Sequence, residues 1–177
     1  GYDLIEGDSY RTQEKEDAVV VNEHLKFTPN ESFVLEGNLS YLSKNSDNTS
    51  KDLYDRRNEN FTYGAKGTYF INTRNNLNLS WNSDNYKLID KITPTNLQTV
   101  YDNRYNTARL LGGFKLADWN QLTVGTEYVA ENLTASRNNI EDKTNTDYIV
   151  YAQEDIQLGE NLDIIGGARA LKNSQYG

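Results

Sequence analysis

Residues 147–169 read DYIVYAQEDIQLGENLDIIGGAR, and this stretch decides the fold. Two runs flank Gly159-Glu160-Asn161, and the second run alternates between two sides along residues 162–170. One side of that run carries Leu162, Ile164, Gly166, Ala168 and Ala170. The pattern predicts a β-hairpin with a short turn and one apolar face. Each arm has the length of a tilted strand that crosses a bilayer, roughly 9–11 residues.

The rest of the chain repeats this unit. Short turns centre near Asn30, Arg74, Asp118 and Glu160, and a period of about 44 residues indicates a repeated supersecondary unit. Longer polar segments separate the hairpins on the other side, at residues 43–58, 86–103 and 131–146. Short turns at one end and long loops at the other are typical of an outer-membrane barrel.

We therefore expect an all-β fold, an antiparallel up-and-down meander of about eight strands of the transmembrane β-barrel type. The strands fill residues 17–171 as four hairpins. Residues 1–16 are expected to be a polar loop or a chain end, and residues 172–177 a truncated loop.

Composition narrows the class of protein. The 177 residues include no Cys, which excludes disulfides and thiol chemistry. A net charge of −8 argues against a nucleic-acid partner, which needs clustered Lys and Arg. No apolar run reaches the ~18 residues of a transmembrane helix, and the N-terminus does not resemble a signal peptide. The absence of Met indicates a processed form or an excised piece.

Aromatic residues gather at both ends of the expected strands, as in the two girdles of a membrane barrel. The alternative is that Tyr simply favours strands. Glu23 and Glu154 interrupt the apolar face, and a bulge at either place would remove the conflict. The two groups are Phe27, Phe33, Tyr69, Phe70 and Trp119 near the short turns, and Tyr41, Tyr105, Tyr128 and Tyr148 at the far ends.

Several segments of the sequence resemble strands in the barrels of TonB-dependent outer-membrane receptors. The similar segments are residues 148–155 with their tight turn and the Leu-x-Ile-x-x-Gly-x-Arg pattern that ends at Arg169, together with residues 106–110 and 122–128. The chain departs from the family pattern at Ile156, where an aromatic is common, and at Ala170-Leu171, where Tyr-Asp often follows.

The resemblance implies a barrel segment of a receptor in the bacterial outer membrane, roughly a third of a barrel of ~22 strands. The cargo of such a receptor is a metal chelate, haem, a corrinoid or a glycan. The implied partners are outer-membrane lipid or detergent, a plug domain, the remaining barrel strands and a TonB-type energising protein. Neither a plug domain nor a TonB-box segment is visible in the sequence.

Candidate ligand contacts lie at the junctions of strands and long loops. They are Arg56, Arg57, Tyr101 and Arg104, which could meet an anionic ligand or simply pair with neighbouring acids. His24 is the only histidine, and a structural role is expected for it. We expect no enzymatic activity and no cofactor in this chain, since one His so placed assembles no catalytic triad.

Two alternatives remain open. One is a self-contained eight-stranded outer-membrane barrel with an adhesive role, and the other is a soluble β-sandwich that binds carbohydrate. An isolated meander also has two unpaired edges, which tend to recruit other strands. We therefore expect the first and last strands to pair, within one chain or between copies.

Overall fold

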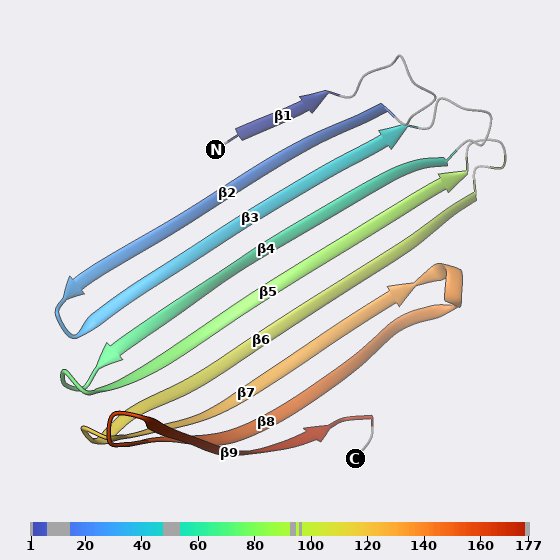
Figure 1. Cartoon of the computed structure of the whole chain (residues 1–177). Coiled ribbons are helices and arrows are strands. Elements are labelled where there is room, and N and C mark those ends of the chain that lie inside the picture. Colours follow the sequence, from blue (N-terminus) through green and yellow to red (C-terminus); the bar gives the residue numbers. More distant parts are fainter. Residues whose placement is uncertain (1, 7–14, 48–53, 93–94, 96, 176–177) are drawn as a thin grey trace.

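The computed structural model describes residues 2–6, 15–47, 54–92, 95 and 97–175, and these form one antiparallel sheet of nine strands. Each strand pairs with its neighbours in sequence, which confirms the predicted all-β meander (Figure 1). The elements are β1 (Tyr2–Glu6), β2 (Lys15–Asn30), β3 (Phe33–Asp47), β4 (Tyr54–Phe70), β5 (Asn75–Ile92), β6 (Leu97–Ala117), β7 (Asn120–Ala135), the 3-10 turn η1 (Ser136–Asn138), β8 (Ile140–Leu158) and β9 (Leu162–Asn173).

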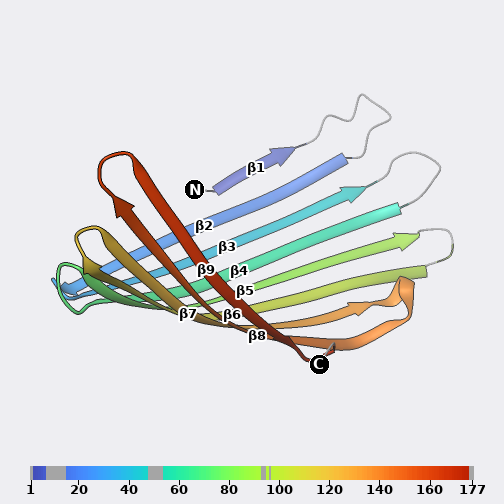
Figure 2. The same ribbon diagram turned by 60° about the horizontal axis from the view of Figure 1, so that its bottom comes forward.

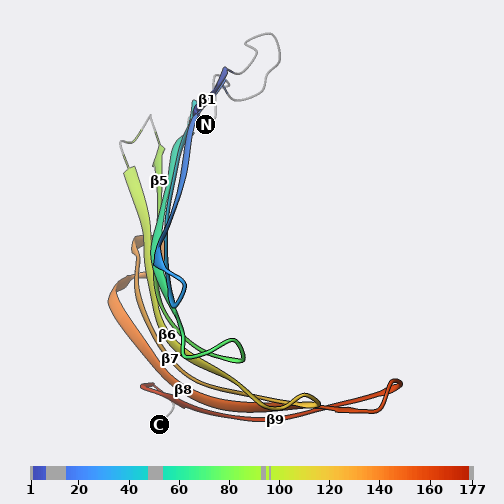
Figure 3. The same ribbon diagram turned by 90° about the vertical axis from the view of Figure 1, so that its left-hand side faces the viewer.

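The sheet is a single curved layer, seen from two further directions in Figures 2 and 3. Among the described residues no second sheet packs over it, so the architecture does not fit a β-sandwich. Strands β1 and β9 lie at the two edges and each pairs on one side alone. Among the residues that the structure describes, the expected pairing of the outermost strands within one chain is therefore absent.

The structure has more strand than the sequence indicated. Residues 1–16 were expected to form a loop, yet β1 lies there and pairs with β2 from Tyr2 opposite Val21 to Glu6 opposite Asp17. The polar segments expected as long loops are also largely strand, because β3 extends to Asp47, β5 to Ile92 and β7 to Ala135. Backbone pairing continues beyond the apolar region, where both faces of the sheet are polar and the alternation disappears from the sequence.

The two faces of the sheet differ sharply. One face is apolar and exposed, with Leu79 at 63% and Leu25 at 74% of full exposure. The other is polar, and most of the buried side chains lie on it, including Val129 and Ile149. The register brings into one apolar face Leu25, Phe27, Leu35, Leu39, Phe61, Tyr63, Tyr69, Leu79, Trp81, Leu110, Leu116, Val124, Tyr128, Tyr148, Val150, Leu162 and Ile164.

The apolar band runs obliquely across the strands. Following the register from Phe61 in β4 across to β8 leads to Thr144. The aromatic that bounds the band in β8 is Tyr148, which lies four residues nearer the short turn. The band therefore shifts by about one residue per strand, which corresponds to strands tilted by roughly 35–45° from the normal of the band.

Neither glutamate on the apolar face is removed from it by a bulge. Glu23 pairs in register with Leu39, and Glu154 pairs in register with Leu122 and Gly166. Glu154 instead accepts a hydrogen bond from the Asn120 side chain at 2.8 Å, at the short-turn end of the sheet. The register shifts fall elsewhere, between Phe27 and Asn30, between Lys115 and Ala117, and between Leu133 and Ala135.

Candidate functional site

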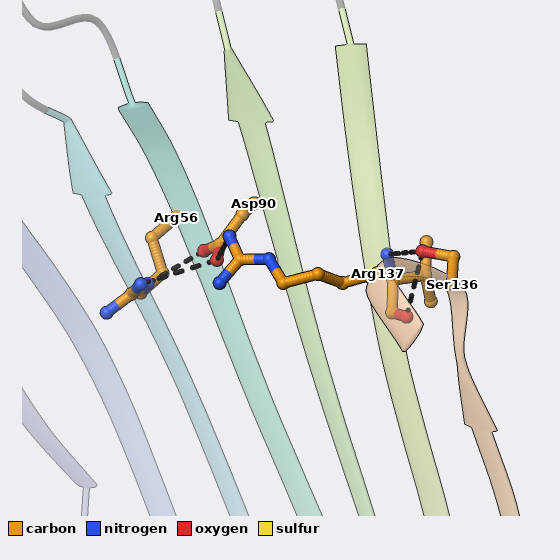
Figure 4. Close-up of polar contacts among 5 residues, drawn as sticks. Arg56, Asp90, Ser136 and Arg137 are labelled. Atoms are coloured by element: carbon orange, nitrogen blue, oxygen red, sulfur yellow. Dashed lines mark hydrogen bonds and ion pairs between the residues drawn. The ribbon is translucent and has the colours of Figure 1, made fainter. Parts of the chain in front are cut away.

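The long-hairpin end of the sheet holds a buried carboxylate on the polar face. Asp90, near the end of β5, lies opposite Arg56 in β4 and Thr99 in β6. Arg56 donates two hydrogen bonds to it, from Nε to Oδ1 at 2.8 Å and from Nη2 to Oδ2 at 3.3 Å (Figure 4). The Asp90 side chain is 8% exposed, whereas that of Arg56 is 58% exposed. Planar, bidentate pairing of this kind fixes geometry as well as charge.

The turn between β7 and β8 lies against β6, one strand away from this carboxylate. The Ser136 hydroxyl accepts a hydrogen bond from the Val100 N–H at 2.7 Å and donates one to the Val100 carbonyl at 3.2 Å. The side chain thus replaces the ladder partner that β7 no longer offers. It anchors η1, from which Arg137 reaches Asp90 with 3.8 Å between Nη2 and Oδ2 (Figure 4).

A cavity of about 160 Å³ lies under this turn. Two guanidinium groups meet one carboxylate there, and the Arg137 side chain is 70% exposed. The Tyr101 ring packs edge-to-face on Tyr86 at 5.9 Å between centroids. The cavity is lined by Leu88, Asp90, Thr99, Val100, Tyr101, Ala135, Arg137 and Asn138. Such a site can accept a small anionic group, held by guanidinium charge beside an aromatic wall.

The four residues singled out from the sequence divide between the two faces. Arg56 and Tyr101 lie on the polar face beside Asp90. Arg57 and Arg104 lie on the opposite face, where Arg57 pairs with Glu59 and Arg104 lies 3.7 Å from Asp102. The structure therefore brings two of the four together.

Sequence reasoning missed the carboxylate and the turn. Asp90 fell in a segment expected to be a loop, and Ser136 and Arg137 in another. Nothing local in the sequence marks them, because the cluster depends on the register of three hairpins. The one usable signal was a cation near the end of a polar segment, as Arg56 is in residues 43–58.

His24 lies on the polar face of β2 opposite Asn38. Within the described ranges, no three His, Cys, Asp or Glu side chains gather as a metal site would require. The same ranges hold no helix long and apolar enough to cross a membrane.

The short-turn end is held by a different ion cluster. Asp118 lies 3.2 Å from Lys115 and 3.4 Å from Arg74, and thereby joins two neighbouring turns. The hydrogen bond from Lys115 and the charges of Arg74 and Lys115 lower the pKa of Asp118 below its usual value. The side chain of Asp118 is 75% exposed, so this link is a surface contact of small energy.

Comparison with known proteins identifies the class of fold. No family model matches the chain, and no curated protein matches it in sequence. Among solved structures it is similar to the copper transporter OprC, with a TM-score of 0.67 and 11% identity. The match covers 92% of this chain and 30% of the transporter, so the chain spans less than a third of that protein's length. The chain therefore has the predicted all-β fold of the transmembrane β-barrel type.

Proposed function

We propose that the chain forms part of the wall of a TonB-dependent receptor in the bacterial outer membrane. The oblique apolar band carries this proposal. A soluble sheet has no reason to keep an exposed apolar face whose edges shift by one residue per strand. Strands that cross a bilayer at a tilt of roughly 35–45° require that shift. The polar face then lines the interior of the barrel, and the long hairpins project beyond the membrane.

The Asp90 cluster lies on the interior face of those long hairpins, at the mouth of the proposed barrel. The positive charge of Arg56 and Arg137 favours an anionic cargo, and the copper transport named for the structural neighbour favours a metal. A metal in an anionic chelate satisfies both. Haem, corrinoids and glycans are the other cargoes of the class, and glycans are the least suited to a cluster that offers fixed positive charge.

Spin labels placed along β5 will test the membrane placement. The chain contains no Cys, so a single introduced Cys carries the only label. Labels at Leu77, Leu79 and Trp81 are expected to be accessible to oxygen, which partitions into lipid. Labels at the alternate positions Asn78, Ser80 and Asn82 are expected to be accessible to a water-soluble nickel complex. An electron paramagnetic resonance scan without this two-residue alternation would contradict the proposal.

Uptake measurements will test the cargo. Arg56→Gln and Arg137→Gln are each expected to reduce uptake of an anionic iron or copper chelate about tenfold, the effect of losing one charge-assisted hydrogen bond. Arg57→Gln is the matched control, because this arginine lies one residue away on the opposite face. Equal uptake by all three variants would exclude the Asp90 cluster as a cargo contact, without affecting the membrane placement.

A further inference from the structure

The outer face of the sheet becomes polar beyond the tyrosines that bound the apolar band, and it is hollowed there. The hollow has a volume of about 320 Å³ and is distinct from the Asp90 cavity, which lies on the other face. It is lined by Asp102, Arg104, Asn132, Thr134, Asp142 and Thr144, which come from β6, β7 and β8.

The lining side chains form two adjacent rows across three strands. Arg104, Asn132 and Thr144 share one row of the register. Asp102 and Thr134 are paired in the next row. Hydrogen bonds hold the rows in place, from the Thr144 hydroxyl to Asn132 Oδ1 at 2.7 Å and from the Thr134 hydroxyl to Asp142 Oδ1 at 2.9 Å. The result is a preorganised grid of hydroxyl, amide and carboxylate groups.

The height of the grid limits what can reach it. Asn132 and Thr134 lie four and six residues beyond Tyr128 along β7. At ~3.4 Å per residue and a tilt of ~40°, these positions stand roughly 10 and 16 Å above the tyrosine. The headgroup layer of a phospholipid leaflet extends only about 5–7 Å beyond the hydrocarbon. A phospholipid headgroup therefore ends below the grid.

The charges of the lining also argue against a ligand that binds through a phosphate group. Asp102 and Asp142 outnumber the one guanidinium of Arg104, which already lies 3.7 Å from Asp102. Lys87 of β5 lies opposite Asp102 on the same face, so the charges balance and leave no excess positive charge for a phosphate group. Neutral vicinal hydroxyls suit it well, because carboxylate and amide groups can pair with them in both directions.

We infer that this grid binds the saccharide headgroup of a glycolipid in the outer leaflet. The inference rests on the proposed membrane placement. The acyl chains of such a lipid lie against the apolar band at Tyr128 and Tyr148, and its sugars extend upward onto the rows of Asn132 and Thr134. One molecule is then held by both parts of the same continuous face.

The test uses the full chain in detergent micelles and a fluorescent glycolipid with an uncharged oligosaccharide headgroup, with binding followed by anisotropy. Asn132→Ala combined with Thr134→Val is expected to weaken binding about tenfold, through the loss of two neutral hydrogen bonds. The matched control is Asn103→Ala combined with Thr107→Val. It changes the same residue types on the interior face of β6, and unchanged binding is expected.

Three outcomes overturn the inference. They are equal affinity for the same lipid anchor without its sugars, equal affinity for the free oligosaccharide, and equal weakening by both variant pairs. Spin-label accessibility along β5 in the same preparation separates the two proposals. If the alternation holds and the saccharide is not recognised, the glycolipid site alone is wrong. If the alternation is absent, the membrane placement fails and the site fails with it.

Discussion

Ala152→Arg is expected to destabilise the membrane-inserted protein by about 2–4 kcal/mol, the cost of a cation at the middle of a lipid-facing strand. Ala152 lies on the apolar face of β8, midway between Tyr148 and Ile156, and is exposed. The substitution removes no packing, since alanine contributes only a methyl group. Its effect therefore reports the surroundings of the side chain. The measurement is reversible unfolding by urea in lipid vesicles, followed by the fluorescence of the native tryptophans.

Gln153→Arg is the matched control. Gln153 is the next residue of the same strand, is also exposed, and lies on the polar face opposite Thr123 and Gly167. A change within about 0.5 kcal/mol is expected, as for an ordinary surface substitution. If both variants are equally stable, the apolar face is not in contact with lipid. If both are equally destabilised, the strand tolerates no large side chain and the comparison rejects the assignment of faces.

The sequence predicts the hairpins and their faces well, because one-sided burial leaves a period of two in the residues. Residues 162–170 show the alternation directly, and β9 occupies the same stretch. The sequence pattern does not predict strands where both faces of the sheet are polar. Along residues 86–103 polar side chains stand on both sides, so the composition is that of a loop although β5 and β6 pair through Ile92 and Leu97.

The candidate site could be predicted from the sequence only in part, for a related reason. Arg56 could be singled out as a cation at the edge of a polar segment, but its partner depends on register. Asp90 stands opposite it because the β4–β5 hairpin closes at the turn before Asn75. A shift of one residue in that turn would place the carboxylate on the other face. Arg57 and Arg104 were grouped with Arg56 by sequence proximity, which carries no information about faces.

The second large effect concerns Gly125 in β7. It is paired with Tyr151 of β8, and both residues lie on the polar face of the sheet. The tyrosine ring lies over the glycine. A Cβ added at Gly125 would stand 2.6 Å from Tyr151 Cζ and 2.8 Å from Leu111 Cδ2, inside contact distance of both. Gly125→Ala is expected to cost about 1–3 kcal/mol of unfolding free energy, as overpacking of a well-filled site does. Urea unfolding followed by tryptophan fluorescence measures this cost.

Gly166→Ala provides the control, because nothing lies within 4 Å of a Cβ added at Gly166. There the substitution is expected to be neutral or to stabilise by about 0.4–1 kcal/mol, since alanine restricts the unfolded chain more than glycine does. A double-mutant cycle identifies the cause. If the ring is responsible, Gly125→Ala should cost at least 0.5 kcal/mol less in a Tyr151→Ala background than in the native chain. An undiminished cost in that background would assign the strain to Leu111 and would refute the packing of Tyr151 over Gly125.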